Sequence, residues 1–181
     1  MTEVVLIRRF SEPISSDYLD AASLDLGWCR KLYGVTPLVS FLALDGLRCA
    51  CIFRAPDAEA VRNVVRAGKR SEPEGIWACT IHPGADDDGK ADSVLGKGRL
   101  VVIERRFEAP VTFDEVQATQ NDNISHFKLH GVRAIRSYLS ADRRRMVCLY
   151  DAPHADAVGH ANRLSGLPFD RFWPAQLVSS E

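Results

Sequence analysis

The chain carries an internal repeat, in which segments of the first half recur 97 positions later in the second half. The clearest matches are Arg8–Phe10 with Arg105–Phe107, Lys31–Val35 with Lys128–Val132, and Cys51–Pro56 with Cys148–Pro153. Chance does not place this many matches in one register. An internal repeat constrains the fold strongly, because each copy must form a unit of the same architecture.

The repeat predicts three parts in the chain. The first copy covers residues 1–82, and the second covers residues 99–181. Residues 83–98 between them are rich in glycine and aspartate and lack apolar periodicity, which is typical of a flexible surface linker. We therefore predict two related folding units that this linker joins.

Each copy has the pattern of a βαββαβ unit. The elements expected in the first copy are a strand at Val4–Phe10, a helix from Ser15 or Ser16 to Tyr33, a hairpin of Val35–Leu44 and Arg48–Phe53, a helix after Pro56-Asp57 and a strand at Ile76–Ile81. This order is the ferredoxin-like motif, whose sheet has one uncovered face that a second copy can bury. The predicted fold class is α+β, with two tandem ferredoxin-like βαββαβ units forming a pseudo-twofold dimeric α/β barrel.

Charge and hydropathy narrow the range of partners and compartments. The formal net charge is −1, so the overall charge does not favour binding to nucleic acid or to a membrane surface. No apolar run approaches the roughly 20 residues that span a bilayer, and the first residues have the wrong order of charges for a signal peptide. The five cysteines contain no CxxC pair. We therefore expect a cytoplasmic protein with reduced thiols that binds neither nucleic acid nor a membrane.

The second copy contains the stretch HGVRAIRSYLSADRRRMVCLYDAP from His130 to Pro153, followed by GLPFDRFWPA at Gly166–Ala175. This sequence resembles a family of small bacterial ferredoxin-like proteins that includes a nickel-binding member. The resemblance implies a ferredoxin-like fold that is dimeric or pseudo-dimeric. The nickel-binding pattern has histidines where this chain has Asn162 and Leu167, so a nickel site here would need other residues.

The first helix differs between the copies along one face. In the first copy this face is mainly apolar and consists of Leu19, Ala22, Leu26, Cys29 and Tyr33. The matched positions of the second copy hold Val116, Thr119, Asn123, His126 and His130. Two interpretations follow from this pattern. Either Asn123, His126 and His130 line a cavity, or the helix buries Ile124 and Phe127 instead and leaves the histidines in solvent.

Asp122, His126 and His130 follow one another at intervals of four residues. Side chains four residues apart are neighbours on a helix, so these three could converge. A carboxylate that orients an imidazole is suited to acid–base catalysis. The same three residues could instead form a partial site for nickel or zinc. A plain surface location is the third interpretation, because histidine is often only partly buried.

The strands of the second copy are also more polar than those of the first. Ile7, Val39 and Phe41 of the first copy are replaced by Glu104, Arg136 and Tyr138 in the second. If the copies pair, one contributes an apolar wall and the other a polar wall, which is typical of pockets for small organic molecules. An ordinary ion pair between Glu104 and Arg136 is the alternative. The cysteines at matched strand positions, Cys51 and Cys148, are interpreted as core residues.

The leading functional hypothesis is a cofactor-free enzyme of isomerase, lyase or ring-opening type that acts on a small, largely apolar molecule. His126 or His130 would be the acid or base, and Asp122 would orient it. The expected substrate contacts are Asn123, Tyr138, Arg136, Glu104, Phe41 and Val39. A nickel- or zinc-binding protein that uses His126 and His130 is one alternative. The other is a non-catalytic ligand-binding or assembly module, which could form a homo-oligomer.

Overall fold

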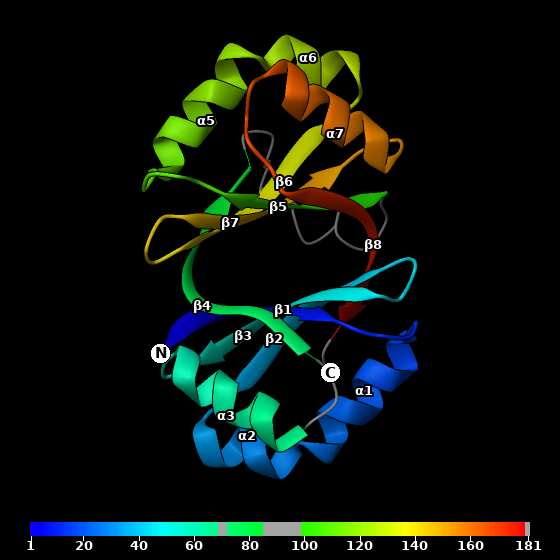
Figure 1. Ribbon diagram of the computed structural model, residues 1–181, viewed down its shortest axis with the longest axis vertical. Helices are drawn as coiled ribbons and strands as arrows, with labels where there is room; N and C mark the ends of the chain where they lie inside the picture. Colours follow the sequence, from blue (N-terminus) through cyan, green and yellow to red (C-terminus); the bar gives the residue numbers. More distant parts are fainter. Residues whose placement is uncertain (69–71, 85–98, 180–181) are drawn as a thin grey trace. The chain divides into compact units, whose positions relative to one another are not determined.

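The structure is a computed structural model that describes residues 1–68, 72–84 and 99–179 (Figure 1). The chain divides into two compact units. Unit 1 consists of Met1–Cys79 together with the chain end from Gln176, and unit 2 consists of Thr80–Ala175.

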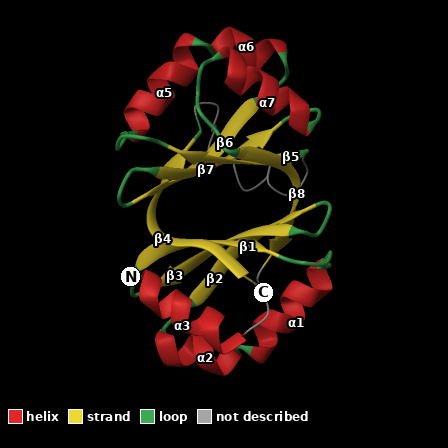
Figure 2. Cartoon of the chain, viewed as in Figure 1, coloured by secondary structure: helices red, strands yellow, loops and turns green. Residues whose placement is uncertain are grey.

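Unit 1 is a sheet covered on one face by helices. Its elements are β1 (Thr2–Arg9), α1 (Ser16–Asp25), α2 (Gly27–Tyr33), β2 (Thr36–Ala43), β3 (Arg48–Ala55), α3 (Ala58–Gly68) and the start of β4 (Glu72–Pro83). The strands are antiparallel in the order β2-β3-β1-β4. The three helices lie against the same face of this sheet (Figure 2). This is the βαββαβ order that the sequence predicts, including the hairpin between β2 and β3.

The core of unit 1 lies between the sheet and its helices. Side chains alternate along a strand, so every second residue of β1 and β3 faces the helices. Val4 and Leu6 of β1 pack there with Cys49, Cys51 and Phe53 of β3. Arg8 is the next helix-facing position of β1. An arginine therefore follows two buried apolar residues on this face of the strand.

Unit 2 repeats the element order of unit 1. Its elements are β5 (Leu100–Arg106), α5 (Phe113–Asp122), α6 (Ile124–Leu129), β6 (Arg133–Ser140), β7 (Arg145–Asp151), α7 (Ala155–Leu164) and β8 (Arg171–Ser179). The strand order is β6-β7-β5-β8. Val101, Ile103, Cys148 and Tyr150 face the helices and belong to the core of this unit. The order of elements agrees with the predicted repeat, while a duplication as its origin stays a prediction.

The boundaries of the two units fall inside β4 and β8. Strand β4 begins in unit 1 and ends in unit 2, and β8 does the reverse. The order of hydrogen-bonded strands closes on itself as β1-β3-β2-β8-β5-β7-β6-β4, which is the strand order of a closed barrel. The units therefore end at different residues from the predicted copies. Of the predicted linker at residues 83–98, residues 85–98 lie outside the described part of the chain.

The first helix of each copy is interrupted, whereas the sequence predicts one continuous helix. In unit 1 the break is at Leu26, just before Gly27, a poor helix former. In unit 2 it is at Asn123, whose side-chain amide donates to the Thr119 carbonyl oxygen at 2.9 Å. A side chain that bonds to its own helix competes with the backbone and favours a helix end. Asp122, His126 and His130 therefore do not share one continuous helix.

Candidate ligand-binding site

A pocket of about 60 Å³ lies between the sheet and the helices of unit 1. Strands β1, β2, β3 and the end of β8 contribute to its wall, together with the three helices. Most of the lining side chains are apolar, among them Leu19, Leu26, Phe53, Val64 and Val178. The polar lining residues are Arg8, Asp20, Ser23, Arg30, Ser40 and Cys51. A mostly apolar wall with a few polar groups is the usual make-up of a small-molecule site.

Two arginines at this pocket have unused hydrogen-bond donors. The Nε atoms of Arg8 and Arg30 are buried, and neither has a hydrogen-bond partner in the part of the chain that the structure describes. Arg30 also donates from Nη2 to the carbonyl oxygen of Ser23 at 2.7 Å, which fixes its side chain. Burial lowers the pKa of Arg30, but an arginine retains its charge at neutral pH. The pocket is therefore electropositive.

Two cysteines of β3 lie in contact beside Arg8. The Sγ atoms of Cys49 and Cys51 are 3.4 Å apart, because residues two apart on a strand share a face. In the strand register, Arg8 lies opposite Cys49 and Ser40 lies opposite Cys51. Hydrogen bonding from Cys49 lowers the pKa of Cys51 to about 6, with further help from the charge of Arg8 and from Ser40, against the opposing effect of burial. The pKa of Cys49 is raised, so Cys49 holds the proton.

Unit 2 has an arginine at the matched position, Arg105, but its donors are satisfied. Its Nη2 donates to the Tyr150 hydroxyl at 2.9 Å and to Asn162 Oδ1 at 2.6 Å. Its Nη1 donates to the carbonyl oxygen of Pro168 at 2.8 Å. Gln120 Nε2 donates to the same Tyr150 hydroxyl at 2.5 Å. Arg105 is only 2% exposed, so this network forms a closed polar core.

The partners of Arg105 are missing from unit 1. The repeat places Phe53 where unit 2 has Tyr150, Val65 where it has Asn162, and Ser23 where it has Gln120. The first two replacements remove oxygen atoms that accept from the arginine, and the third shortens the side chain that donates to the Tyr150 hydroxyl. Arg8 therefore lies beside a pocket, whereas Arg105 lies within a filled network.

The predicted histidine cluster lies in the helix layer of unit 2 and does not line the unit 1 pocket. Asp122 is exposed, and Asn123, His126 and His130 are half-buried on the helix layer of unit 2. Phe127 is buried in α6, as the alternative interpretation expected, whereas Ile124 is only half-buried. His130 packs edge-on against His160 at 4.7 Å between ring centres, and its buried Nε2 has no hydrogen-bond partner among the described residues. This imidazole contact was not predicted from the sequence.

The predicted polar strand residues lie on the opposite face of the unit 2 sheet from these histidines. Tyr138 pairs with Val147 and Arg136 with Leu149, whereas the helix-facing residues of β7 are Met146, Cys148 and Tyr150. The sheet therefore separates Arg136, Tyr138 and Glu104 from His126 and His130. In unit 1, Phe41 and Val39 likewise alternate with the helix-facing residues of β2. The sheet thus splits the predicted site into two sets of residues.

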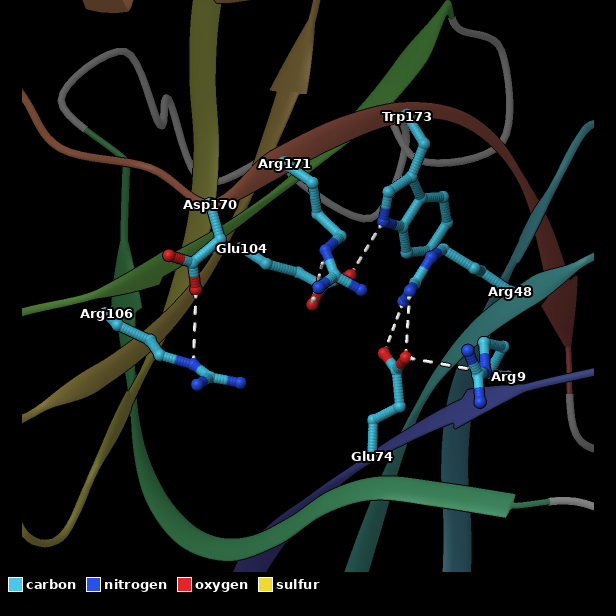
Figure 3. A network of polar contacts seen from close by, with 8 residues as sticks. All are labelled: Arg9, Arg48, Glu74, Glu104, Arg106, Asp170, Arg171 and Trp173. Carbon is cyan, nitrogen blue, oxygen red and sulfur yellow. Dashed lines mark hydrogen bonds and ion pairs between the residues drawn. The ribbon is translucent and has the colours of Figure 1, made fainter.

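Glu104 takes part in polar contacts within unit 2 (Figure 3). Trp173 Nε1 donates to its Oε1 at 2.9 Å, and Arg171 Nε lies 4.0 Å from its Oε2. A separate ion pair joins Arg106 to Asp170 at 3.3 Å. In unit 1, Figure 3 shows Glu74 between two arginines, with its carboxylate 2.5 Å from Arg48 and 3.7 Å from Arg9. Glu104 thus has structural partners that the sequence did not indicate.

Two further features are absent from the described part of the chain. Over residues 1–68, 72–84 and 99–179, no group of three or more His, Cys, Asp or Glu side chains is arranged to hold a metal ion. Within those same ranges, no helix is long and apolar enough to cross a membrane.

Comparison with protein families finds a match for the second half of the chain. Residues 102–174 match the family described as Nickel responsive protein SCO4226-like. The chain is therefore similar to that family over most of unit 2, in agreement with the resemblance noted in its sequence. No curated protein matches the chain.

Comparison with solved structures finds proteins of a similar fold. A provisionally assigned chlorite dismutase aligns with a TM-score of 0.53 at 13% identity, over 98% of this chain and 94% of that one. A heme-binding protein from Thermus thermophilus aligns with a TM-score of 0.48 at 8% identity, over 97% and 91% of the two chains. The first similarity concerns the fold alone. Together with the strand order, it confirms the predicted fold class, the α+β fold of dimeric α/β barrels.

Sequence reasoning missed Arg8 and Arg30 as candidate site residues. The signal for Arg8 was present, because Val4, Leu6 and Arg8 alternate on one face of a strand whose other members are buried. A charged residue in such a series indicates either a buried network or a site. The repeat of this arginine at position 105 pointed to a shared structural role instead.

Proposed function

We propose that the protein binds a small organic anion, a carboxylate with a short apolar body, in the pocket of unit 1. The observation that carries this proposal is that Arg8 and Arg30 both line the pocket and both have a buried Nε without a partner among the described residues. Leaving a buried donor unsatisfied costs about 1–3 kcal/mol. A ligand oxygen within reach of these atoms would recover that free energy on binding.

The arginine network of unit 2 supports an oxygen-bearing ligand. Arg105 donates there from its Nη atoms to three oxygen atoms, of Tyr150, Asn162 and Pro168, and from its Nε to the sulfur of Cys148. Phe53 and Val65 supply no oxygen at the matched positions of unit 1. A carboxylate offers two acceptor oxygens and a negative charge, which suits a guanidinium better than a neutral acceptor does.

The rest of the pocket supports a short apolar body. A water molecule needs roughly 10–15 Å³ of cavity volume, so a cavity of about 60 Å³ leaves room for a ligand of roughly four to six heavy atoms. The apolar side chains of α1 and α3 would contact its hydrocarbon part. Asp20 is the one acidic residue on this wall, and it is exposed.

The test is a thermal unfolding experiment with butyrate and with its uncharged analogue butyramide. A ligand that binds only the folded state stabilises it by about 2.7 kcal/mol at one hundred times its Kd. We expect butyrate to raise Tm in a concentration-dependent manner and butyramide to have little effect. Inorganic phosphate, which has charge without an apolar body, should stabilise less than butyrate.

Two variants connect that effect to the pocket. Arg8→Met should abolish stabilisation by butyrate, because it removes the guanidinium with its buried Nε and keeps a side chain of similar length. Arg9→Met is the matched control, since Arg9 is exposed and its ion pair with Glu74 lies outside the pocket lining. If butyrate has no effect on the wild type, or the same effect on Arg8→Met as on Arg9→Met, the proposal is wrong.

Acid–base catalysis on a small molecule stays a prediction from the sequence. His126 and His130 belong to unit 2 and do not line the pocket of unit 1. An isomerase or lyase reaction would therefore need a second site at these histidines or another group beside the pocket. A turnover assay on any ligand identified by the butyrate experiment, repeated with His126→Ala and His130→Ala, addresses this prediction directly.

Transition-metal binding is the second candidate, and one observation favours it. The buried Nε2 of His130 has no hydrogen-bond partner among the described residues, and the His160 ring lies against it. The described residues provide no complete metal site, so two imidazoles would need water to complete the coordination. Calorimetric titration of untagged protein with nickel tests this function. Binding that survives His130→Ala would exclude this location.

A further inference from the structure

The contact between Cys49 and Cys51 is more specific than core packing requires. Cys51 lines the unit 1 pocket although it is only 3% exposed, and Cys49 is fully buried behind it. Their sulfur atoms are 3.4 Å apart, within hydrogen-bonding distance for sulfur. Ser40 lies opposite Cys51 on β2. Cys51 therefore has two hydrogen-bond donors beside it and a small empty volume in front of it.

The charges around this sulfur favour the thiolate. Arg8 on β1 lowers the pKa of Cys51, after the larger effect of the Cys49 hydrogen bond. The other charged residues at the pocket are Arg30 on α2 and Asp20 on α1, while α3 contributes only valines to the lining. The thiolate is the nucleophilic form of cysteine, and reactive cysteines lie in electropositive surroundings with access for a reagent. The unit 1 pocket combines these conditions.

We propose that Cys51 is a site of oxidation by hydroperoxides, which reach it through the unit 1 pocket. The proposal does not depend on carboxylate binding, because it stands on the cysteine pair and on the space in front of Cys51. Hydrogen peroxide and small alkyl hydroperoxides have a suitable size for a pocket of about 60 Å³.

The reaction is a two-electron oxidation of sulfur. The Cys51 thiolate attacks one peroxide oxygen, the S–O bond forms and the O–O bond breaks. The leaving hydroxide or alkoxide takes a proton from water, and the sulfur becomes a sulfenic acid. One small thiol then displaces water from the sulfenic acid to form a mixed disulfide. A second thiol releases the Cys51 thiolate and leaves as the oxidised disulfide.

Cys49 acts as a positioning residue in this scheme. Residues two apart on a strand have Cα atoms about 6.6–6.8 Å apart, at the upper limit of the range for a disulfide. Closing a bond between Cys49 and Cys51 would distort a strand that is paired on both sides. The sulfenic acid of Cys51 should therefore persist, and the role of Cys49 is to donate a hydrogen bond to the thiolate.

Two other cysteines of the chain, Cys148 and Cys79, serve as internal controls for the reactivity of Cys51. Cys148 occupies the matched strand position in unit 2 and accepts a hydrogen bond from Arg105 Nε at 3.5 Å. Its neighbour at the position of Cys49 is Met146, which donates no hydrogen bond, and Cys148 itself does not line the unit 1 pocket. Burial raises the pKa of Cys79 to about 12, with a smaller effect from Glu3. These two cysteines should react slowly.

The experiment treats the native protein with a small excess of hydrogen peroxide and traps sulfenic acid with dimedone. Peptide mass spectrometry then gives a labelling rate for each cysteine. We expect Cys51 to label at least about tenfold faster than Cys148 or Cys79. If Cys148 or Cys79 labels as fast as Cys51, the assignment of a specific site is overturned, because the reagent then reaches buried thiols in general.

The pH dependence of Cys51 labelling tests the role of Cys49. In the wild type, the rate should reach half its maximum well below the usual thiol pKa of about 8.5. Cys49→Ala should move that midpoint upward, whereas Cys49→Ser, which keeps a donor, should largely restore it. An unchanged midpoint in Cys49→Ala would show that Cys49 does not position the thiolate. The wild-type comparison of Cys51 with Cys148 needs no substitution, so it stands even if a variant fails to fold.

Discussion

Arg105 and Tyr150 are joined by a hydrogen bond of 2.9 Å in the core of unit 2, where both side chains are almost completely buried. Burial raises the pKa of Tyr150 to about 12, so its hydroxyl remains neutral and can accept from both Arg105 and Gln120. The pKa of Arg105 lies above its ordinary value because Tyr150 and Cys148 together outweigh the opposing effect of burial. The buried guanidinium is thus held by hydrogen bonds to Tyr150, Asn162 and the Pro168 carbonyl.

The first prediction compares this arginine with its counterpart. Arg105→Met should destabilise the protein by about 2–4 kcal/mol, because it leaves buried acceptors such as Asn162 Oδ1 and the Pro168 carbonyl without a donor. Arg8→Met should change stability by less than about 1 kcal/mol, because the buried Nε of Arg8 has no partner to lose among the described residues. Urea unfolding of both variants measures the difference. Equal losses would mean that Arg8 also belongs to a structural network.

The sequence predicted most of the fold because the fold depends on regular patterns. The order of strands and helices in each unit, including the hairpin between β2 and β3, forms as expected. The candidate site was harder to predict, because it depends on which face each strand residue takes. Tyr138 and His130 both replace less polar residues of the first copy. They lie on opposite faces of the unit 2 sheet, however, so they cannot line one site.

The pocket was missed for a related reason. Arg8 and Arg105 are identical in the repeat, so a comparison of the copies at these positions alone shows no difference. The copies differ in the residues around the arginine. Phe53 and Val65 of the first copy correspond to Tyr150 and Asn162 of the second. Those residues come from other elements, and only the packing of helices on the sheet brings them together. A one-dimensional pattern does not carry that information.

The second prediction concerns pH and His82. Its ring stacks on Phe113 at 4.2 Å between centres, and its Nε2 lies 2.7 Å from the Thr80 hydroxyl. Burial lowers the pKa of His82 in the folded protein, against a smaller opposing effect of Asp114. The folded state therefore binds this proton less readily than the unfolded state does. The stability that depends on neutral His82 is fully present above about pH 6.5 and is lost as the pH falls through the folded pKa.

His82→Gln provides the comparison, because glutamine is polar and does not titrate in this range. Urea midpoints measured over the range of about pH 7.5 to 5 should fall more steeply for the wild type than for the variant. Parallel pH profiles for the two proteins would contradict the assigned role of His82.

The third prediction concerns the cost of removing the histidines of α6. The buried Nε2 of His130 has no partner among the described residues, so truncation loses no hydrogen bond there. His130→Ala should therefore cost less than the roughly 1–3 kcal/mol expected for a hydrogen-bonded buried side chain. Phe127→Ala on the same helix should cost about 3–5 kcal/mol, since Phe127 packs in the core. A large loss in His130→Ala would indicate a structural role and weaken both functional alternatives for this residue.

The last prediction concerns a double variant that introduces the side-chain partners of Arg105 at the matched positions of unit 1. The double variant Phe53→Tyr with Val65→Asn places a hydroxyl and an amide at the positions that hold Arg105 in the other copy. If Arg8 then receives these hydrogen bonds, the new groups occupy the arginine and part of the pocket. Stabilisation by butyrate should disappear, and so should the preferential labelling of Cys51.

The single variant Val65→Leu is the control for this transfer, because it adds volume on the same helix without an oxygen acceptor. It should weaken butyrate binding less than the double variant does, provided that the pairing of Arg8 decides the affinity. The double variant should also keep an unfolding midpoint near or above that of the wild type, since a half-buried arginine gains hydrogen-bond partners. Undiminished butyrate binding in a well-folded double variant would mean that the free donors of Arg8 are not the basis of recognition.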